Sequence, residues 1–333
     1  MYEIGVIGAG SWGTAISWLL SNNGHKITVW SAIKDEIEML KAQREHKDKL
    51  PGVALGDNID FTSDLSEVCR DKEILVLAVP SPFTRSTAGG MKGLVKEGQI
   101  IVSVAKGIEE DTLLTLSGVI KDELPGAEVV VLSGPSHAEE VGKGMPTAIV
   151  AGCKDIEKAK KVQDIFMSDV FRVYTSDDPY GMELGGALKN VIALAAGIAD
   201  GLGYGDNTKA ALITRGIHEI SLLGEAAGGR YETFQGLTGI GDLIVTCASM
   251  HSRNRRAGIL IGQGKSYEEA MSEVKQVVEG VYSAKAAMKL AGKYGVQLPI
   301  ISQVNDILFG GKSAKEALYD LMSRERKDEF FVS

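Results

Sequence analysis

The sequence predicts an α/β domain built on a doubly wound sheet over residues 1–178, followed by an all-helical domain over residues 179–333. Three observations support this fold class. Short β-branched runs alternate with helical stretches in the first half, a G-x-G-x-x-G pattern lies near the start, and strand-like runs cease after about residue 179. A chain of 333 residues also exceeds what one hydrophobic core usually holds, which favours two domains.

The first half contains seven strand-like runs. They are IGVIG (4–8), KITVW (26–30), EILVLAV (73–79), QIIVSVA (99–105), EVVVLSG (128–134), TAIVAG (147–152) and FRVYTS (171–176). Most are apolar almost throughout, as strands of a parallel sheet covered on both faces must be. Their alternation with helical stretches predicts a Rossmann-type doubly wound sheet.

The stretch VIGAGSWGTA places Gly8, Gly10 and Gly13 between the first strand and a helix that Gly24 closes. Gly8 permits a sharp turn, Gly10 lets the backbone approach a pyrophosphate, and Gly13 lets the helix pack closely on the sheet. The anion would then lie at the helix N-terminus, where free N–H groups favour negative charge. Because the chain holds 40 glycines, the flanking strand and helix carry the inference of a dinucleotide site.

The end of the second strand does not decide between NAD and NADP. A carboxylate about 20 residues beyond the glycines binds the ribose of NAD, and a nearby arginine accommodates the phosphate of NADP. Ser31, Ala32 and Ile33 stand at that place, so neither determinant is present. Ser31 could bind either cofactor, and Lys34 could reach a 2′-phosphate or simply be solvated at a helix start.

A cation follows a later strand of the sheet. Ligands of open α/β sheets bind beyond the carboxyl ends of the strands. Lys106 in VAKGIEED lies between a buried-type strand and a glycine, where a solvated side chain is not needed. We therefore expect Lys106 to be functional rather than an ordinary surface lysine.

The segment LSGPSHAEEV follows another strand. Gly134, Pro135 and Ser136 are expected to turn the chain into a helix that starts near Ala138 and to offer polar groups to a substrate oxygen. His137 could serve as an acid or base, or be a surface residue or helix cap.

The second half shows only helical spacing of apolar residues. The expected helices cover residues 187–202, 209–229, 266–274, 281–295 and 313–323, with glycine-rich turns between them. The chain has no internal repeat and no low-complexity linker, so a rigid interface between the two halves is expected.

Composition narrows the classes of function. The hydrophobic content of 44% and charged content of 24% are those of an ordinary globular protein. The net charge of −8 argues against a nucleic-acid surface or an anionic membrane surface, although local cations could still bind a small anion. Cys69, Cys153 and Cys247 have no metal-ligand spacing and are expected to pack in a reducing compartment. No apolar run is expected to approach the ~20 residues of a membrane span, and the N-terminus lacks a basic signal region, so a cytoplasmic location is expected.

Long ordered motifs make the chain resemble a known enzyme family. GAGSWGTA, VAKGIE, LSGPSHAEEV, GGALKNVIALAAGIADGLGYGDNTKAALITRG and GLTGIGDLIVTCASMHSRNRRAG are similar to the NAD(P)-dependent sn-glycerol-3-phosphate dehydrogenases of bacterial type. The likeness runs over essentially the whole chain and includes LPGVAL and VVEGV. It implies reversible hydride transfer between NAD(P)H and dihydroxyacetone phosphate, giving sn-glycerol 3-phosphate for glycerophospholipid synthesis, and a homodimer.

The resemblance also assigns roles to individual residues. Lys189 in the LKN motif would be the catalytic general acid and base. The substrate-binding positions would be Lys106, Gly134, Ser136, Lys189, Asn190, Asp242, Ser252, Arg253 and Asn254. The cofactor-binding positions would be Ser11, Trp12, Lys106, Ala138, Arg253, Val277 and Glu279, beside Gly8, Gly10 and Gly13 of the glycine pattern. Many family members carry a basic residue just after the second strand where this chain has SAI, which argues against a strong NADP preference.

These residue types suit ketone reduction. An ammonium group at the carbonyl oxygen can stabilise developing charge and donate a proton, provided that burial and a second cation lower its pKa. Asp242 and Thr246 would share one helix face and could orient Lys189, although Asp242 could instead cap that helix.

The segment SRNRR is the candidate binding site for the phosphate of the substrate. Arg253 with Asn254 supplies the several donors that a phosphate requires, while Arg255 and Arg256 are expected to remain solvated.

Two alternatives remain open at this stage. A dehydrogenase of the same build that acts on a 3-hydroxy acid or a sugar acid would need a carboxylate-binding group in place of the SRN segment. A non-catalytic dinucleotide sensor would retain the glycines but would not need both Lys106 and Lys189.

Overall fold

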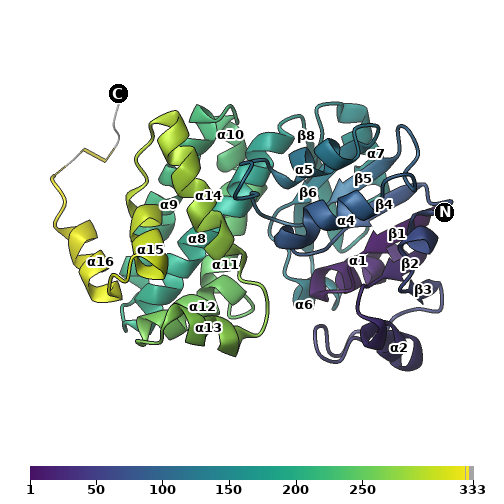
Figure 1. Cartoon of the computed structure of the whole chain (residues 1–333), viewed down its shortest axis with the longest axis horizontal. Helices are drawn as coiled ribbons and strands as arrows, with labels where there is room; N and C mark the ends of the chain where they lie inside the picture. Colours follow the sequence, from purple (N-terminus) through teal and green to yellow (C-terminus); the bar gives the residue numbers. More distant parts are fainter. Residues whose placement is uncertain (327, 330–333) are drawn as a thin grey trace.

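The computed structural model describes residues 1–326, 328 and 329 and has two halves that lie side by side (Figure 1). The first half is an eight-stranded sheet with helices on its faces, and the second is helical. The strands of the first half are β1 (Glu3–Ile7), β2 (Lys26–Trp30), β3 (Ile59–Thr62), β4 (Ile74–Leu77), β5 (Ile100–Ser103), β6 (Glu128–Ser133), β7 (Thr147–Gly152) and β8 (Phe171–Ser176). The predicted fold class is confirmed.

The sheet order is β3-β2-β1-β4-β5-β6-β7-β8, and all neighbouring strands are parallel except β6 and β7. The interpretation of the apolar runs as strands of a parallel sheet fails only between β6 and β7. The connection from β6 to β7 carries only the one-turn helix α6 (Ala138–Val141), which packs against α1 (Ser11–Asn22). Because a parallel neighbour needs a longer crossover back over the sheet, β7 returns antiparallel.

Helices cover both faces of this sheet. Besides α1 and α6, they are α2 (Lys34–Gln43), α3 (Leu65–Cys69), the 3₁₀ turn η1 (Ser81–Phe83), α4 (Thr84–Gly90), α5 (Leu116–Glu123) and α7 (Ile156–Phe166). Successive side chains of β4 enter opposite cores, with Ile74 and Val76 on one face and Leu75 and Leu77 on the other. This two-sided burial explains the apolar runs of the central strands.

The second half is built around helix α8 (Pro179–Gly201). The other elements are α9 (Asp206–Ala226), α10 (Tyr231–Phe234), the π-helical turn η2 (Leu237–Gly241), α11 (Asp242–Ala248), α12 (Arg253–Gly262), α13 (Tyr267–Val274), α14 (Glu279–Tyr294), α15 (Pro299–Phe309) and α16 (Ala314–Met322). Figure 1 shows α8 near the middle of this half. The all-helical expectation is confirmed, with α10, α12 and α15 added.

Helix α8 is buried from Gly181 to Ala199. In the part of the chain that the structure describes, it is the one helix long and apolar enough to cross a membrane, and its apolar window is 100% buried inside the protein. Glu183 and Lys189 interrupt its apolar residues, so no single apolar run approaches the length of a membrane span although the helix itself does. The burial identifies α8 as the core helix of its domain.

Glycines bring α12 and α14 into backbone contact with α8. A Cβ atom at Gly197 would lie 2.1 Å from the carbonyl oxygen of Arg255, and one at Gly258 would lie 2.3 Å from that of Leu194. A Cβ atom at Gly280 would lie 2.6 Å from a carbonyl oxygen of α8. We call these three positions the glycine seam, and no larger residue fits there without moving a helix.

A buried carboxylate joins the two halves. Glu183 on α8 accepts hydrogen bonds from the backbone N–H of Ser117 at 2.8 Å and from its hydroxyl at 2.5 Å, at the start of α5. Burial raises the pKa of Glu183 despite these bonds. The contact fits the expected rigid interface, because a buried carboxylate without these donors would be costly.

Candidate active site

The glycine turn after β1 leaves room for a dinucleotide pyrophosphate. Gly8 has φ of 120°, which side chains rarely adopt, and a Cβ atom at Gly13 would lie 1.9 Å from the Gly8 carbonyl oxygen. A Cβ atom at Gly10 would have no neighbour within 4 Å, so that side is open. The helix α1 begins at Ser11 with no side-chain cap, which leaves its first N–H groups for an anion. These residues fit the predicted cofactor.

The remaining cofactor candidates come from three places. Ser11 and Trp12 open α1, Ala138 opens α6, and Val277 precedes α14. Glu279, the first residue of α14, is buried and accepts hydrogen bonds from the backbone of Ser81 at 3.2 Å and from its hydroxyl. Because Ser81 lies in the first half, just after β4, this contact joins the helical half to the first half.

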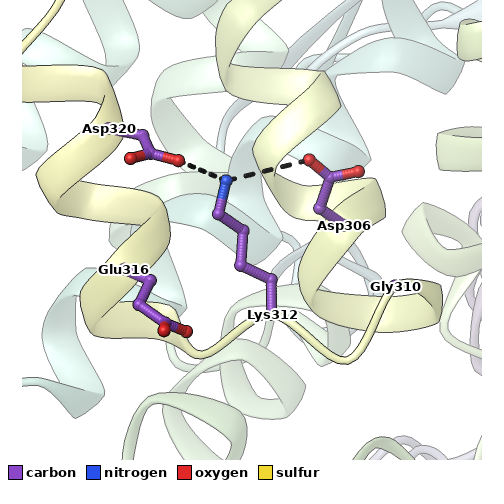
Figure 2. Close-up of a pocket in the computed structure, with 5 residues that line it drawn as sticks. All are labelled: Asp306, Gly310, Lys312, Glu316 and Asp320. Carbon is purple, nitrogen blue, oxygen red and sulfur yellow. Dashed lines mark ion pairs between the residues drawn. The ribbon is translucent and has the colours of Figure 1, made fainter.

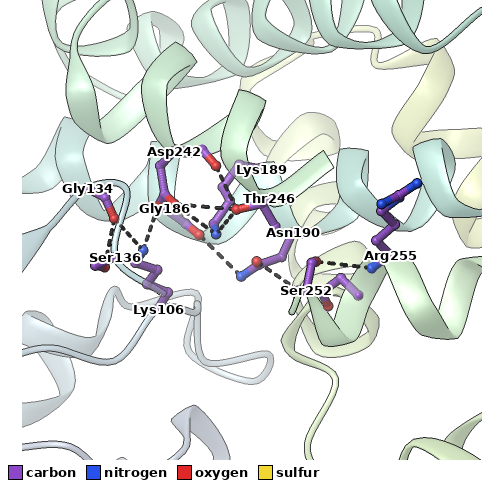
Figure 3. Close-up of polar contacts among 11 residues, drawn as sticks. Lys106, Gly134, Ser136, Gly186, Lys189, Asn190, Asp242, Thr246, Ser252 and Arg255 are labelled. Atoms are coloured by element: carbon purple, nitrogen blue, oxygen red, sulfur yellow. Dashed lines mark hydrogen bonds and ion pairs between the residues drawn. The ribbon is translucent and has the colours of Figure 1, made fainter. Parts of the chain in front are cut away.

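Two lysines share one buried carboxylate at the centre of the site (Figure 3). Asp242 meets Lys106 through Oδ2 at 2.6 Å and Lys189 through Oδ1 at 3.1 Å. The side chains of Lys189 and Asp242 are 7% and 2% exposed. Lys106 belongs to the first half, whereas Asp242 and Lys189 belong to the second, so the cluster spans the interface between the halves.

Thr246 also binds the ammonium group of Lys189. The Lys189 ammonium donates to Thr246 Oγ1 at 2.6 Å, and the Thr246 hydroxyl lies 2.6 Å from the backbone carbonyl of Asp242, to which it donates. The expected shared face of Asp242 and Thr246 is present. The alternative reading of Asp242 as a helix cap is wrong, because η2 runs directly into α11 and the carboxylate turns to the lysines.

The cluster sets the charge states of its members. Burial lowers the pKa of Lys189 to about 8, with Lys106 acting in the same direction and Asp242 opposing. Burial also opposes ionisation of Asp242, yet the two ammonium groups hold its pKa below its usual value. Lys189 is therefore a buried acid that can lose its proton near neutral pH.

The turn after β6 faces the same cluster. Lys106 donates to the carbonyl oxygen of Gly134 at 3.0 Å, and the Ser136 hydroxyl donates to the same oxygen at 2.9 Å. Gly134 has φ of 143°, and α6 begins at Ala138 as expected. Gly134 and Ser136 are thus brought to Lys106.

His137 is more deeply placed than the sequence suggested. Its side chain caps no helix, and its Nε2 atom is buried without a hydrogen-bond partner in the described residues. Burial and the charge of Lys189 lower its pKa, and its ring lies 5.8 Å from that of His251. His137 does occupy the N-cap position of α6, but its side chain makes no capping hydrogen bond and the residue is half-buried rather than exposed.

A chain of amides fixes the other side of the site. Asn254 Nδ2 donates to Asn190 Oδ1 at 2.9 Å, and Asn254 Oδ1 accepts from the Gly280 N–H at 2.8 Å. Asn190 Nδ2 also donates to the Gly186 carbonyl at 3.3 Å. These bonds join α8, α12 and α14, so both asparagines position the site as well as facing it.

The start of α12 presents two arginines, Arg253 and Arg256, whose side chains form no hydrogen bond or ion pair within the described residues. Ser252 caps the helix by accepting from the Arg255 N–H at 3.2 Å. Arg253 follows it, is half-buried with a lowered pKa caused by burial, and forms no hydrogen bond or ion pair within the described part of the chain. A guanidinium left free in this way suits a multivalent anion.

The expectation that Arg255 is solvated was wrong. Arg255 Nε donates to Asp200 at 2.8 Å and its Nη1 donates to the Ala248 carbonyl at 2.7 Å, so it braces α12 against α8. Arg256 is half-buried. Lys34 is exposed at the start of α2, which fits the solvated alternative.

A hollow elsewhere on the surface lies between α15 and α16 (Figure 2). Its cation, Lys312, is paired with Asp306 at 4.0 Å and with Asp320. Glu316 at its edge forms the capping box of α16 with Ser313. These charges already satisfy one another, so we assign no chemistry to this hollow.

The sequence matches two family models over most of its length. Residues 3–159 match the NAD-dependent glycerol-3-phosphate dehydrogenase N-terminus, and residues 178–319 match the C-terminus of the same family. The chain belongs to the NAD-dependent glycerol-3-phosphate dehydrogenase family. The expected enzyme class, an oxidoreductase that acts on a CH–OH group with NAD or NADP, is confirmed.

Individual relatives of this glycerol-3-phosphate dehydrogenase family agree. A protein of Agathobacter rectalis named glycerol-3-phosphate dehydrogenase is 65% identical over 99% of this chain and 98% of its own. One of Fusobacterium nucleatum is 60% identical over 99% of both chains. The crystal structure of glycerol-3-phosphate dehydrogenase from Coxiella burnetii is 35% identical with a TM-score of 0.93, covering 97% of this chain and 99% of that one.

Proposed function

We propose that the protein catalyses reversible hydride transfer between NAD(P)H and dihydroxyacetone phosphate, giving sn-glycerol 3-phosphate for glycerophospholipid synthesis. The observation that carries this reaction is the carboxylate of Asp242 shared by Lys106 and Lys189. It holds a proton donor with a pKa of about 8 where the two halves of the molecule meet.

We assign the proton transfer to Lys189 and its positioning to the neighbouring residues. The nicotinamide ring supplies or accepts the hydride. The Lys189 ammonium donates its proton to the ketone oxygen during reduction, and as a neutral amine it removes the hydroxyl proton during oxidation. Asp242 and Thr246 hold the Lys189 Nζ atom in one direction, and Lys106 adds a second positive charge beside the developing alkoxide.

The phosphate of the substrate would bind away from the reacting carbon. Arg253 supplies a planar set of donors that no described residue already uses. The Ser136 hydroxyl and the amide groups of Asn190 and Asn254 would line the space between phosphate and ketone. Ser252 contributes by capping the helix that carries Arg253.

Further parts of the proposal rest on the family resemblance. We propose that residues 1–178 and 179–333 are the cofactor and substrate domains, supported by the end of β8 at Ser176 and the start of α8 at Pro179. We also propose a cytoplasmic homodimer, whose mass can be measured by light scattering.

The decisive experiment supplies purified protein with NADH or NADPH and follows nucleotide oxidation after dihydroxyacetone phosphate is added. We expect turnover that depends on the phosphorylated ketone. Turnover with a 3-oxo acid and none with dihydroxyacetone phosphate would favour the hydroxy-acid alternative. Nucleotide binding with no turnover of either would favour the sensor.

The pH dependence of the rate should follow the protonation of the Lys189 side chain. Because its ammonium form donates the proton, kcat/KM for reduction should fall about tenfold per pH unit above a pH near 8. Oxidation of glycerol 3-phosphate needs the neutral amine, so its rate should rise through the same pH. Initial rates in both directions across this range test the sign, and NADH affinity measured at each pH serves as the control. Two profiles that move in the same direction would contradict the role.

Removal of the free guanidinium should act on substrate affinity. Arg253→Ala should raise KM for dihydroxyacetone phosphate about 100-fold, since charge-assisted bonds to a phosphate contribute roughly 3 kcal/mol. Arg172→Ala, on the exposed face of edge strand β8, is the matched control and should leave KM unchanged. An unaltered KM in Arg253→Ala would move the phosphate site elsewhere.

A further inference from the structure

We propose that the turn after β2 selects NAD(H) over NADP(H), because the Ser31 hydroxyl can only accept a further hydrogen bond and a buried carboxylate stands behind it. This inference rests on the proposed function, since it concerns the cofactor site of the same enzyme. The residues that carry it are Ser31, Ile33 and Glu36, which the glycine pattern does not include.

The turn after β2 lies where this fold binds the adenosine ribose of a dinucleotide. The backbone N–H of Gly8 donates to the carbonyl oxygen of Trp30 at 2.9 Å, so the glycine turn and the end of β2 are adjacent. Ser31 follows Trp30 directly. In this fold the ribose that bears the 2′-group lies at the end of the second strand.

Three donors of the turn, at Ser31 and Ile33, are occupied, whereas the Ala32 N–H makes no hydrogen bond within the described residues and α2 begins without a side-chain cap. The Ser31 hydroxyl donates to Glu36 Oε2 at 2.5 Å, and the Ser31 N–H donates to the Thr62 carbonyl at 3.2 Å. The Ile33 N–H donates to Ser31 Oγ at 3.2 Å. One lone pair of Ser31 Oγ remains, and a hydroxyl oxygen in that state can only accept.

The two cofactors differ in the hydrogen-bonding group that they present to Ser31 Oγ at the 2′ position of the ribose. The ribose of NAD(H) carries a 2′-hydroxyl, which can donate to Ser31 Oγ. The ribose of NADP(H) carries a 2′-phosphate, which has only acceptor oxygens when ionised and requires donors or cations. The hydrogen-bond pattern at Ser31 and Ile33 therefore complements the hydroxyl.

The charge behind Ser31 acts in the same direction. Glu36 is buried, which alone would raise its pKa, but hydrogen bonds from His46, Lys49 and Ser31 lower it to about 2. Its carboxylate is thus ionised, and both His46 and Lys49 contact Oε1 while Oε2 faces Ser31. Asp35 adds a second acidic residue in the first turn of α2.

One cation could oppose this selection. Lys34 is exposed and forms no ion pair with any residue that the structure describes. A long flexible side chain loses rotamer freedom when it is fixed on a phosphate, so a single surface lysine replaces the missing arginine poorly. Its removal is therefore one arm of the test.

Equilibrium binding of NADH and NADPH, followed by nucleotide fluorescence without substrate, tests the proposal on the full-length protein. We expect the Kd of NADPH to exceed that of NADH about tenfold or more, and Lys34→Ala to leave this ratio within about twofold. Ala32→Arg, on the exposed turn, should narrow the ratio by improving NADPH binding. Ser31→Ala should narrow it by weakening NADH binding.

Glu36→Gln removes the buried charge and should also narrow the ratio, with unchanged circular dichroism required of the variant. Asp35→Asn is its matched control, since it removes one acidic charge from the same helix turn without contacting Ser31, and should leave the ratio unchanged. Equal or tighter binding of NADPH by the unmodified protein would overturn the proposal, as would binding of neither nucleotide. Intact NADH binding without turnover of dihydroxyacetone phosphate would contradict the proposed reaction alone.

Discussion

Lys189→Ala is expected to lower kcat for reduction of dihydroxyacetone phosphate about 10²- to 10⁴-fold. The ketone oxygen would lose its proton donor, and the nearest cation left would be Lys106, which is held by Asp242 and by the Gly134 carbonyl. The Kd of NADH should change by less than about twofold, because Lys189 lies on α8 and the glycine turn precedes α1. Steady-state rates and nucleotide fluorescence measure the two effects separately.

The fold should tolerate this change. Alanine favours a helix, and Asp242 keeps its ion pair with Lys106. Lys160→Ala, which removes an exposed lysine from α7, is the matched control and should retain full activity. Turnover near the normal rate in Lys189→Ala would remove the residue from the acid and base role.

Asp242→Asn should affect both rate and stability. The negative charge of Asp242 raises the pKa of Lys189, so its loss should move the alkaline fall in the reduction rate to lower pH. At pH 8 we expect kcat/KM to drop about 10- to 100-fold, since one pKa unit is worth about tenfold in protonation. Removal of the counter-ion of the buried Lys189 and the half-buried Lys106 should also cost about 3 kcal/mol of the free energy of unfolding.

A matched control separates the two effects of Asp242→Asn. Asp200 also bridges two cations, meeting Lys209 at 2.9 Å and Arg255 at 2.8 Å at the far end of α8. Asp200→Asn should lower thermal stability without moving the pH profile. A pH profile that is unchanged in Asp242→Asn would show that this carboxylate is only structural.

The sheet illustrates which features of a fold a sequence carries. KITVW and TAIVAG match β2 and β7 residue for residue, because short, mostly apolar runs rich in β-branched residues are typical of strands in a sheet. Strand β3 was not predicted, since its four residues include the exposed Asp60. The direction of β7 could not be predicted either, because a run of apolar residues has the same pattern in both directions.

The site shows a different limit. Lys106 and Asp242 are 136 residues apart in sequence and meet only because α11 is packed against α8 at the domain interface. Family resemblance named both residues, but neither spacing nor periodicity predicts their ion pair. Arg255 was misjudged for a related reason: of the three arginines in RNRR only Arg255 is bound to Asp200, and only the three-dimensional packing distinguishes it from Arg253 and Arg256.

The glycine seam has a consequence for how this enzyme can be altered. Lys189, Arg253 and Glu279 lie on three helices whose backbones touch at the seam, so the distances between the proposed proton donor, phosphate ligand and cofactor contact depend on the same helix packing. A methyl group added at any seam position would push a helix outward by roughly an ångström, and a misplacement of that size can cost about 10²-fold in rate. Directed evolution toward longer or bulkier substrates should therefore succeed through side chains that face the site. Libraries that enlarge the seam glycines should yield inactive clones, although none of those glycines touches a substrate.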